Sequence, residues 1–151
     1  MFDRFLPKHI DNTYHGYKLA LWFFGSVVLM KTLMSVNAIF IGRYVASSAD
    51  GIPLETFTPG GAQAVVSLFA AWGLAQLLIC LLCALVLVRY RTLIPFMFAL
   101  LLFEHLSRRL IFHLIPIART GTPPGSVVNL ALIALMVFGL VLSISKRRQQ
   151  V

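Results

Sequence analysis

The sequence has 151 residues, of which 59% are hydrophobic and only 12% are charged, and its formal net charge is +8. A water-soluble domain of this size carries about 25% charged residues because its surface must face water. The low charged fraction therefore excludes an ordinary soluble domain and predicts a single integral membrane domain. The positive charge does not indicate nucleic-acid binding, because the basic residues flank apolar segments and no aromatic platform accompanies them.

Four apolar segments organise the chain, and we expect each to cross the membrane, since about 20 apolar residues span a bilayer as a helix. The predicted fold is therefore an all-α, four-helix transmembrane bundle at residues 17–145. A tail at 1–16 precedes it, either lying on the membrane surface or disordered, and a basic tail at 146–151 follows. The predicted spans are about 17–44, 59–88, 93–117 and 126–144.

Turn-forming residues mark the boundaries between these spans. Thr58 suits a helix N-cap and Pro59 the first helical position. The short polar stretch 89–92 predicts a tight hairpin, so the second and third spans should be antiparallel neighbours. The run 121–125, with two prolines between two glycines, predicts the break before the last span.

The basic residues predict the orientation of the bundle. With four spans, the two tails and the hairpin share one side of the membrane and hold eight lysines and arginines, whereas the opposite loops hold two. Cytoplasmic loops are enriched in such residues, so both termini should be cytoplasmic, and we expect the bacterial inner membrane. The eight are Arg4, Lys8, Lys18, Arg89, Arg91, Lys146, Arg147 and Arg148, and the two are Arg43 and Arg119.

Ionisable residues inside the predicted spans are the unusual feature of this sequence. Lys31 lies near the middle of the first span, and the others gather in the third: Glu104, His105, Arg108, Arg109 and His113. Four formal charges facing lipid would together cost on the order of 10 kcal/mol. We therefore expect them to face protein, water or a ligand, with Glu104 and Arg108 forming an i,i+4 ion pair.

Helical periodicity predicts which faces meet in the bundle interior. Small residues beside Lys31 should permit close helix approach. A polar face of the second span centres on Gln76, and a weaker one of the last span includes Asn129. The predicted stripes are Lys31, Ser35, Ala38 and Gly42; Phe69, Trp72, Gly73, Gln76, Cys80 and Cys83; and Asn129, Met136 and Ser143.

The surplus positive charge of Lys31, Arg108 and Arg109 over Glu104 predicts a site for an anionic lipid head group or small anion, because arginine binds phosphate through parallel hydrogen bonds. Three alternatives stay open. The charges could only hold the helices together, or the polar face of the third span could meet a partner in a larger complex or homo-oligomer. Glu104 and His105 could also act in a lipid-modifying enzyme or a proton-coupled carrier.

The sequence predicts neither a metal nor another cofactor. Cys80 and Cys83 lie three residues apart in an apolar helix, without a second such pair or a histidine at the same level. His105 and His113 are too far apart on one helix to ligate the same haem iron. We therefore expect membrane lipids, rather than a cofactor or nucleic acid, as the natural partners.

Overall fold

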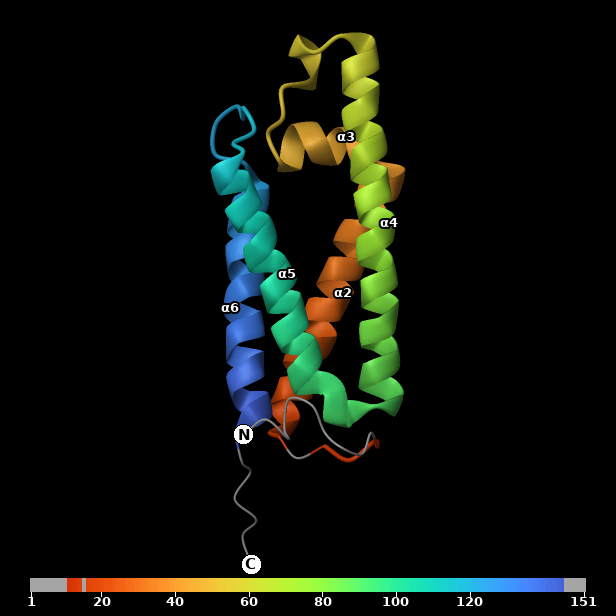
Figure 1. The fold of residues 1–151 in the computed structure, drawn as a ribbon, viewed down its shortest axis with the longest axis vertical. Coiled ribbons are helices and arrows are strands. Elements are labelled where there is room, and N and C mark those ends of the chain that lie inside the picture. The colour runs from red at the N-terminus through yellow and green to blue at the C-terminus, as the bar shows by residue number, and fades with distance from the viewer. Residues whose placement is uncertain (1–10, 15, 146–151) are drawn as a thin grey trace, which may run out of the picture.

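Every regular element is helical in the part of the chain that the computed structural model describes, residues 11–14 and 16–145. The predicted tail 146–151, and most of the predicted tail 1–16, lie outside the described residues. Four long helices run along the long axis of the molecule, with α2 at a slant to the others (Figure 1). They are α2 (Lys18–Phe40), α4 (Pro59–Arg89), α5 (Ile94–Leu114) and α6 (Pro124–Ile144).

Three of the long helices, α2, α4 and α6, are long and apolar enough to cross a membrane. Helix α5 carries Glu104, Arg108 and Arg109 close together, which sets it apart from the other three. Large apolar side chains are exposed along the candidate spans, among them Leu68 and Phe138, as expected of surfaces that face lipid. The structure thus confirms an all-helical protein with three candidate membrane spans, and a fourth span through α5 stays a prediction.

Two helix ends differ from the predicted ones. The first helix ends at Phe40 rather than near residue 44. The chain continues as α3 (Gly42–Tyr44) and the π-helical turn η1 (Val45–Ala49), which run across the bundle axis (Figure 1). Helix α5 ends at Leu114 rather than at 117, because Pro116 disfavours helical backbone angles at Ile115, whose φ and ψ are −123° and 79°.

The predicted start of the second long helix is confirmed. Thr58 has an extended backbone, and its side-chain oxygen accepts a hydrogen bond from the amide of Gly61 at 3.2 Å. Pro59 occupies the first helical position. This cap satisfies an amide that would otherwise have no helical partner. A 3-10 turn, η2 (Leu54–Thr56), lies just before it.

Helix α2 is the central packing element. It packs chiefly against α4 and α6, whereas α5 packs chiefly against α6. Helices α4 and α5 are joined by only a short 3-10 turn, η3 (Arg91–Leu93), yet they make few contacts with each other. The two helices run antiparallel but diverge from the hairpin, so α2 rather than α5 is the chief neighbour of α4 (Figure 1).

Close packing dominates the end of the bundle that carries the hairpin, the start of α2 and the end of α6. The rings of Phe24 and Phe98 meet edge to face with their centroids 5.0 Å apart, and both side chains are completely buried. A Cβ atom at Gly139 would lie 2.3 Å from the Phe98 ring, so only glycine fits there. The edge-to-face contact and the close approach at Gly139 pack α2, α5 and α6 tightly together at this end.

Small residues also bring α2 and α4 together, as the predicted stripe requires. A Cβ atom at Gly73 of α4 would lie 2.9 Å from the Cβ of Ala38 and 2.9 Å from the carbonyl oxygen of Ser35. Ala38 and Ser35 are buried, as is Lys31 one turn earlier on the same stripe. The close approach of these two helices is what buries Lys31 in the interior.

Candidate functional site

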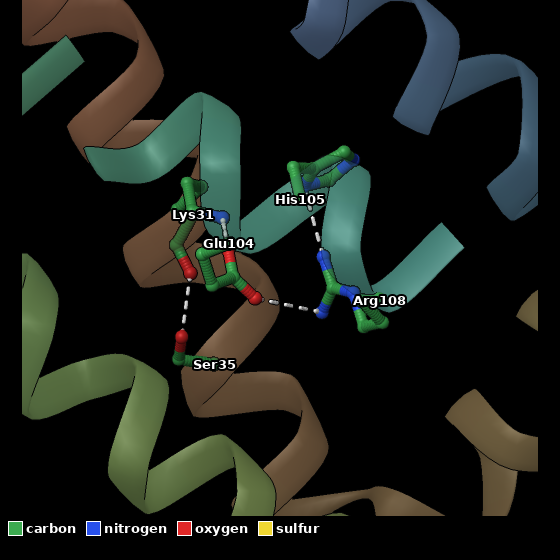
Figure 2. A network of polar contacts seen from close by, with 5 residues as sticks. All are labelled: Lys31, Ser35, Glu104, His105 and Arg108. Atoms are coloured by element: carbon green, nitrogen blue, oxygen red, sulfur yellow. Dashed lines mark hydrogen bonds and ion pairs between the residues drawn. The ribbon is translucent and has the colours of Figure 1, made fainter. Parts of the chain in front are cut away.

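A chain of charged side chains links α2 to α5 in the middle of the bundle (Figure 2). The Nζ of Lys31 lies 3.0 Å from Oε2 of Glu104, and the other carboxylate oxygen of Glu104 lies 3.7 Å from the guanidinium of Arg108. Lys31 is only 3% exposed. The predicted Glu104–Arg108 pair is therefore present, and Glu104 is shared between two cations.

Arg108 is held by three different kinds of contact. Besides Glu104, its guanidinium donates a hydrogen bond to Nδ1 of His105 at 2.9 Å. Because a guanidinium can only donate, Nδ1 accepts, and the neutral ring carries its proton on Nε2. The guanidinium also lies over the Trp72 ring of α4, 4.7 Å from its centroid, at a distance typical of cation–π contacts. These contacts orient Arg108 before any ligand binds.

A cavity of about 400 Å³ opens beside this cluster, toward the end of the bundle that carries α3 and η1. Its polar lining includes three arginines but only one carboxylate, that of Asp50. The apolar part comes from α5 and α6. The lining residues are Asp50, His105, Arg108, Arg109, Phe112, Arg119, Ser126, Val127, Asn129, Leu130 and Ile133.

Contacts between two loops bring Asp50 and Arg119 to this cavity. Gly51 adopts a left-handed backbone with φ of 70°, which glycine allows, and its carbonyl accepts a hydrogen bond from the Thr120 amide at 2.9 Å. At the start of α6, a Cβ atom on Gly125 would lie 2.7 Å from the carbonyl oxygen of Ala49. Glycine at these two positions therefore lets the end of η1 dock on the α5–α6 loop.

Asp50 is the acidic group of the cavity. Burial raises the pKa of the Asp50 carboxyl, and the nearby guanidiniums of Arg119 and Arg108 act in the opposite direction. Its Oδ1 atom would lie 3.2 Å from a Cβ atom placed on Gly125, so the carboxylate sits beside the first turn of α6. A negative charge is favourable at a helix N-terminus, which gives Asp50 a structural reason to be there.

The structure brings most of the predicted cluster together, but it divides the residues into two groups. Lys31 and Glu104 form a partly buried ion pair, whereas Arg109 lines the cavity and makes no ion pair with another described residue. His105 and Arg108 belong to both groups. His113 is exposed and does not line the cavity.

Gln76 and Asn129, the secondary polar residues, have different surroundings. Gln76 is buried on α4, and its Nε2 atom has no hydrogen-bond partner among the described residues. Asn129 lines the cavity, while its Oδ1 atom is buried and likewise has no partner in the described part of the chain. The structure thus places Asn129, but not Gln76, at the cavity.

Sequence reasoning missed three residues of the site. The sequence places Trp72 on the inner face of its helix without a role, although a tryptophan near an expected buried cation favours cation–π contact. The distribution of basic residues assigns Arg119 only to a loop, and the sequence gives Asp50 no role in the site. Nothing in their local sequence shows that the two loops pack together, since they are 69 residues apart at the Gly51–Thr120 contact.

No family model, curated protein or solved structure matched this chain in comparisons with known proteins. The described residues contain no group of three or more histidine, cysteine or acidic side chains that could hold a metal ion. Cys80 and Cys83 are free, buried thiols in the apolar core. Functional inference therefore depends on the geometry and charge of the cavity.

Proposed function

We propose that the protein is a four-helix membrane protein that binds a phosphate or carboxylate group in the cavity between α5 and α6. The group belongs either to a lipid head group or to a small anion. The observation that carries this proposal is the lining of the cavity, in which three guanidinium groups face a single carboxylate.

The fourth span of this proposal is α5. The inward placement of its charges supports the assignment, because Glu104 pairs with Lys31 and Arg108 within the bundle. A paired charge on an interior face is far less costly in a membrane than one that faces lipid. The distribution of basic residues supports cytoplasmic termini in a bacterial inner membrane, which puts the cavity toward the outer side.

The pairing of Lys31 changes which residues supply the binding charge. Lys31 offsets Glu104, so neither adds to the surplus positive charge of the cavity. Arg109 and Arg119 form no ion pair within the part of the chain that the structure describes, and both are largely exposed. An anion between Arg108, Arg109 and Arg119 would gain charge-assisted hydrogen bonds from Arg109 and Arg119, which pair with no described carboxylate.

A binding measurement with matched variants tests the proposal. Lipid-depleted protein in a neutral detergent is mixed with phosphatidylglycerol, glycerol phosphate or inorganic phosphate, and bound ligand is counted by native mass spectrometry. We expect at least one of these ligands to bind, and the double variant Arg109→Ala, Arg119→Ala to weaken its binding by about tenfold or more, since hydrogen bonds to charged groups contribute about 1.5–3 kcal/mol.

The matched control is Arg43→Ala, Arg89→Ala, which removes the same charge from exposed arginines outside the cavity. This control should leave binding nearly unchanged. An equal loss in both double variants would overturn the proposal, because binding would then follow net charge rather than the cavity. Failure of all three ligands to bind the unaltered protein would overturn it as well.

A second candidate function is that of an accessory subunit in a larger membrane complex or a homo-oligomer. The observation that favours it is the exposure of Arg109 and His113 on α5, at positions where a partner helix could meet them. Gentle solubilisation followed by sizing distinguishes the two functions. A stable assembly dissociated by Arg109→Ala, His113→Ala would support the subunit function, and a monomer that binds the anion would exclude it.

A proton relay or lipid-modifying activity at Glu104 and His105 has less support. Both oxygens of Glu104 are engaged by Lys31 and Arg108, and Nδ1 of His105 accepts from Arg108. A general base needs a free acceptor within reach of its substrate. These contacts support a positioning role, in which Glu104 orients Arg108 toward the cavity.

A further inference from the structure

One wall of the cavity is apolar and open to the surroundings. It is formed by Phe112 of α5 and by Val127, Leu130 and Ile133 of α6. Val127 is 70% exposed and Leu130 is 58% exposed, so the wall is open at these two side chains, whereas Ile133 is partly buried against the core. Helix α6 is itself one of the candidate membrane spans, so its exposed apolar residues would face lipid. The cavity therefore joins a cationic surface to a lipid-facing one.

The apolar wall continues along α6 beyond the cavity. Residues 127, 130, 133 and 137 recur at intervals of three and four, so they form one stripe on the helix. Val137, at the far end, is 41% exposed. At 1.5 Å per residue the stripe is about 15 Å long, which is close to half of the roughly 30 Å hydrocarbon thickness of a bilayer. Its length matches the depth of one leaflet.

From this arrangement we infer that the ligand is a single anionic phospholipid rather than a free anion, an inference that rests on the proposed function. The lipid phosphate lies among Arg108, Arg109 and Arg119, and one acyl chain lies along the stripe from Val127 to Val137. A free phosphate would use the cationic part alone and leave the apolar wall without a role. A volume of about 400 Å³ falls within the usual range of ligand sites, about 300–1,000 Å³, and suits one head group.

The apolar part of the site also predicts the route of entry. Because the wall is exposed on α6, a lipid can move in sideways from its own leaflet without leaving the membrane. The head group then meets Arg109 and Arg119, which are exposed, before it reaches Arg108, which is held by Glu104 and Trp72. An ion arriving from water would gain nothing from Leu130 or Ile133.

Two ligands with the same phosphate chemistry test this inference. Phosphatidylglycerol and glycerol phosphate are titrated separately into lipid-depleted protein in a neutral detergent. We expect the phospholipid to bind at least about tenfold more tightly, because burial of only about two methylene groups accounts for such a factor. Leu130→Gln should weaken phospholipid binding by about tenfold and glycerol phosphate binding by much less, because the smaller ligand has no acyl chain to lose. The control is Leu78→Gln, at an equally exposed leucine of α4 that does not line the cavity.

A second measurement does not depend on whether Leu130→Gln inserts well into the membrane. Phosphatidylglycerol with a photoreactive group midway along its acyl chain is cross-linked to the unaltered protein. We expect labelling of α6 between Leu130 and Val137, and its loss in Arg109→Ala, Arg119→Ala. Labelling spread evenly over α4 and α6 would overturn the inference.

The outcomes separate this inference from the function on which it rests. If glycerol phosphate binds as tightly as the phospholipid and both depend on Arg109 and Arg119, the anion site stands and the lipid inference is wrong. If neither ligand binds, or if binding ignores the arginines, the proposed function itself fails.

Discussion

The two ends of the bundle are packed differently. At the hairpin end, apolar residues of all four long helices fill the interior, and glycine at 139 lets α6 press against the buried ring of Phe98. At the opposite end, charged side chains and a cavity of about 400 Å³ occupy the space between α5 and α6. The difference is that apolar packing fills the first end, while the second end leaves polar groups beside an open cavity.

Lys31, Glu104 and Arg108 form the boundary between the two ends. Glu104 makes contact with both cations, and its exposure of 25% contrasts with the 3% of Lys31. A buried pair contributes little net stability, but the loss of one partner leaves an uncompensated charge. Substitutions at this boundary should therefore have the largest effect of those considered below.

The largest expected effect is that of Glu104→Gln. It leaves Lys31 buried without its carboxylate, and we expect a loss of about 3–5 kcal/mol in the free energy of unfolding. Lys31→Met should lower the free energy of unfolding by less, because Glu104 still forms its ion pair with Arg108. The double variant Lys31→Met, Glu104→Gln should be more stable than Glu104→Gln alone, because it no longer contains an unpaired buried charge. Denaturant unfolding in detergent measures all three, with Glu55→Gln as the control at an exposed carboxylate. A Lys31→Met variant as unstable as Glu104→Gln would contradict the shared-carboxylate arrangement.

Gly139→Ala tests the close packing of the hairpin end. The new Cβ would lie 2.3 Å from the Phe98 ring, which is completely buried and packs edge to face against Phe24. We expect a loss of about 1–3 kcal/mol, as is typical of overpacked cores. The midpoint of thermal unfolding in detergent measures it.

The control is Gly60→Ala on α4, where a Cβ would meet nothing within 4 Å. This variant should be neutral or slightly stabilising, because alanine favours a helix over glycine. The double variant Gly139→Ala, Phe98→Leu should lose less than the sum of its single variants, since the smaller side chain makes room for the methyl group. Strict additivity would count against a direct clash.

The pH dependence of ligand binding tests the cavity end. Burial raises the pKa of Asp50, with Arg119 and Arg108 opposing the shift, so the folded protein holds this proton more tightly than the unfolded chain. By linkage this carboxyl stabilises the fold at low pH, and the contribution is lost as pH rises through its folded pKa. Protonation also removes the one negative charge that faces an anionic ligand.

We therefore expect phosphatidylglycerol, whose phosphodiester keeps its charge, to bind more tightly as pH falls through the pKa of Asp50. The expected gain is about tenfold, the scale of one nearby charge at a partly buried site. Asp50→Asn should bind with the higher affinity at all pH values. His105 also lines the cavity. A pH profile unchanged in Asp50→Asn would therefore assign the dependence to His105 or another group.

The smallest expected effect is at Tyr14, beside the hairpin end. Its hydroxyl donates to the Ser143 hydroxyl at 3.1 Å, which ties the segment before α2 to the end of α6. Tyr14→Phe should cost about 0.5–1.5 kcal/mol, the usual net value of one hydrogen bond. Thermal unfolding compares it with Tyr44→Phe, at a tyrosine that is 65% exposed. Equal effects in the two variants would show that the contact contributes nothing.

Hydropathy and helix-breaking residues were enough to predict an all-helical membrane protein, because the requirement to satisfy backbone hydrogen bonds in lipid leaves few alternatives. Thr58 and Pro59 located the start of α4 correctly. The end of α5 was missed although Pro116 marks it, because apolar composition continues past the proline. Four spans, their orientation and the function of the cavity stay predictions.

The sequence by itself determined that Lys31, Glu104 and Arg108 had to avoid lipid, but Arg109 and His113, which were predicted in the same cluster, are exposed. The cost of charge in hydrocarbon forces Lys31, Glu104 and Arg108 inward, and i,i+4 spacing on one helix already pairs Glu104 with Arg108. Only the tertiary structure decided that Lys31 takes the second oxygen of Glu104, because that contact depends on how α2 and α5 are packed. It also brought Asp50 and Arg119 to the cavity. Two loops that are distant in sequence pack together there, and Gly51 and Gly125 allow their close approach.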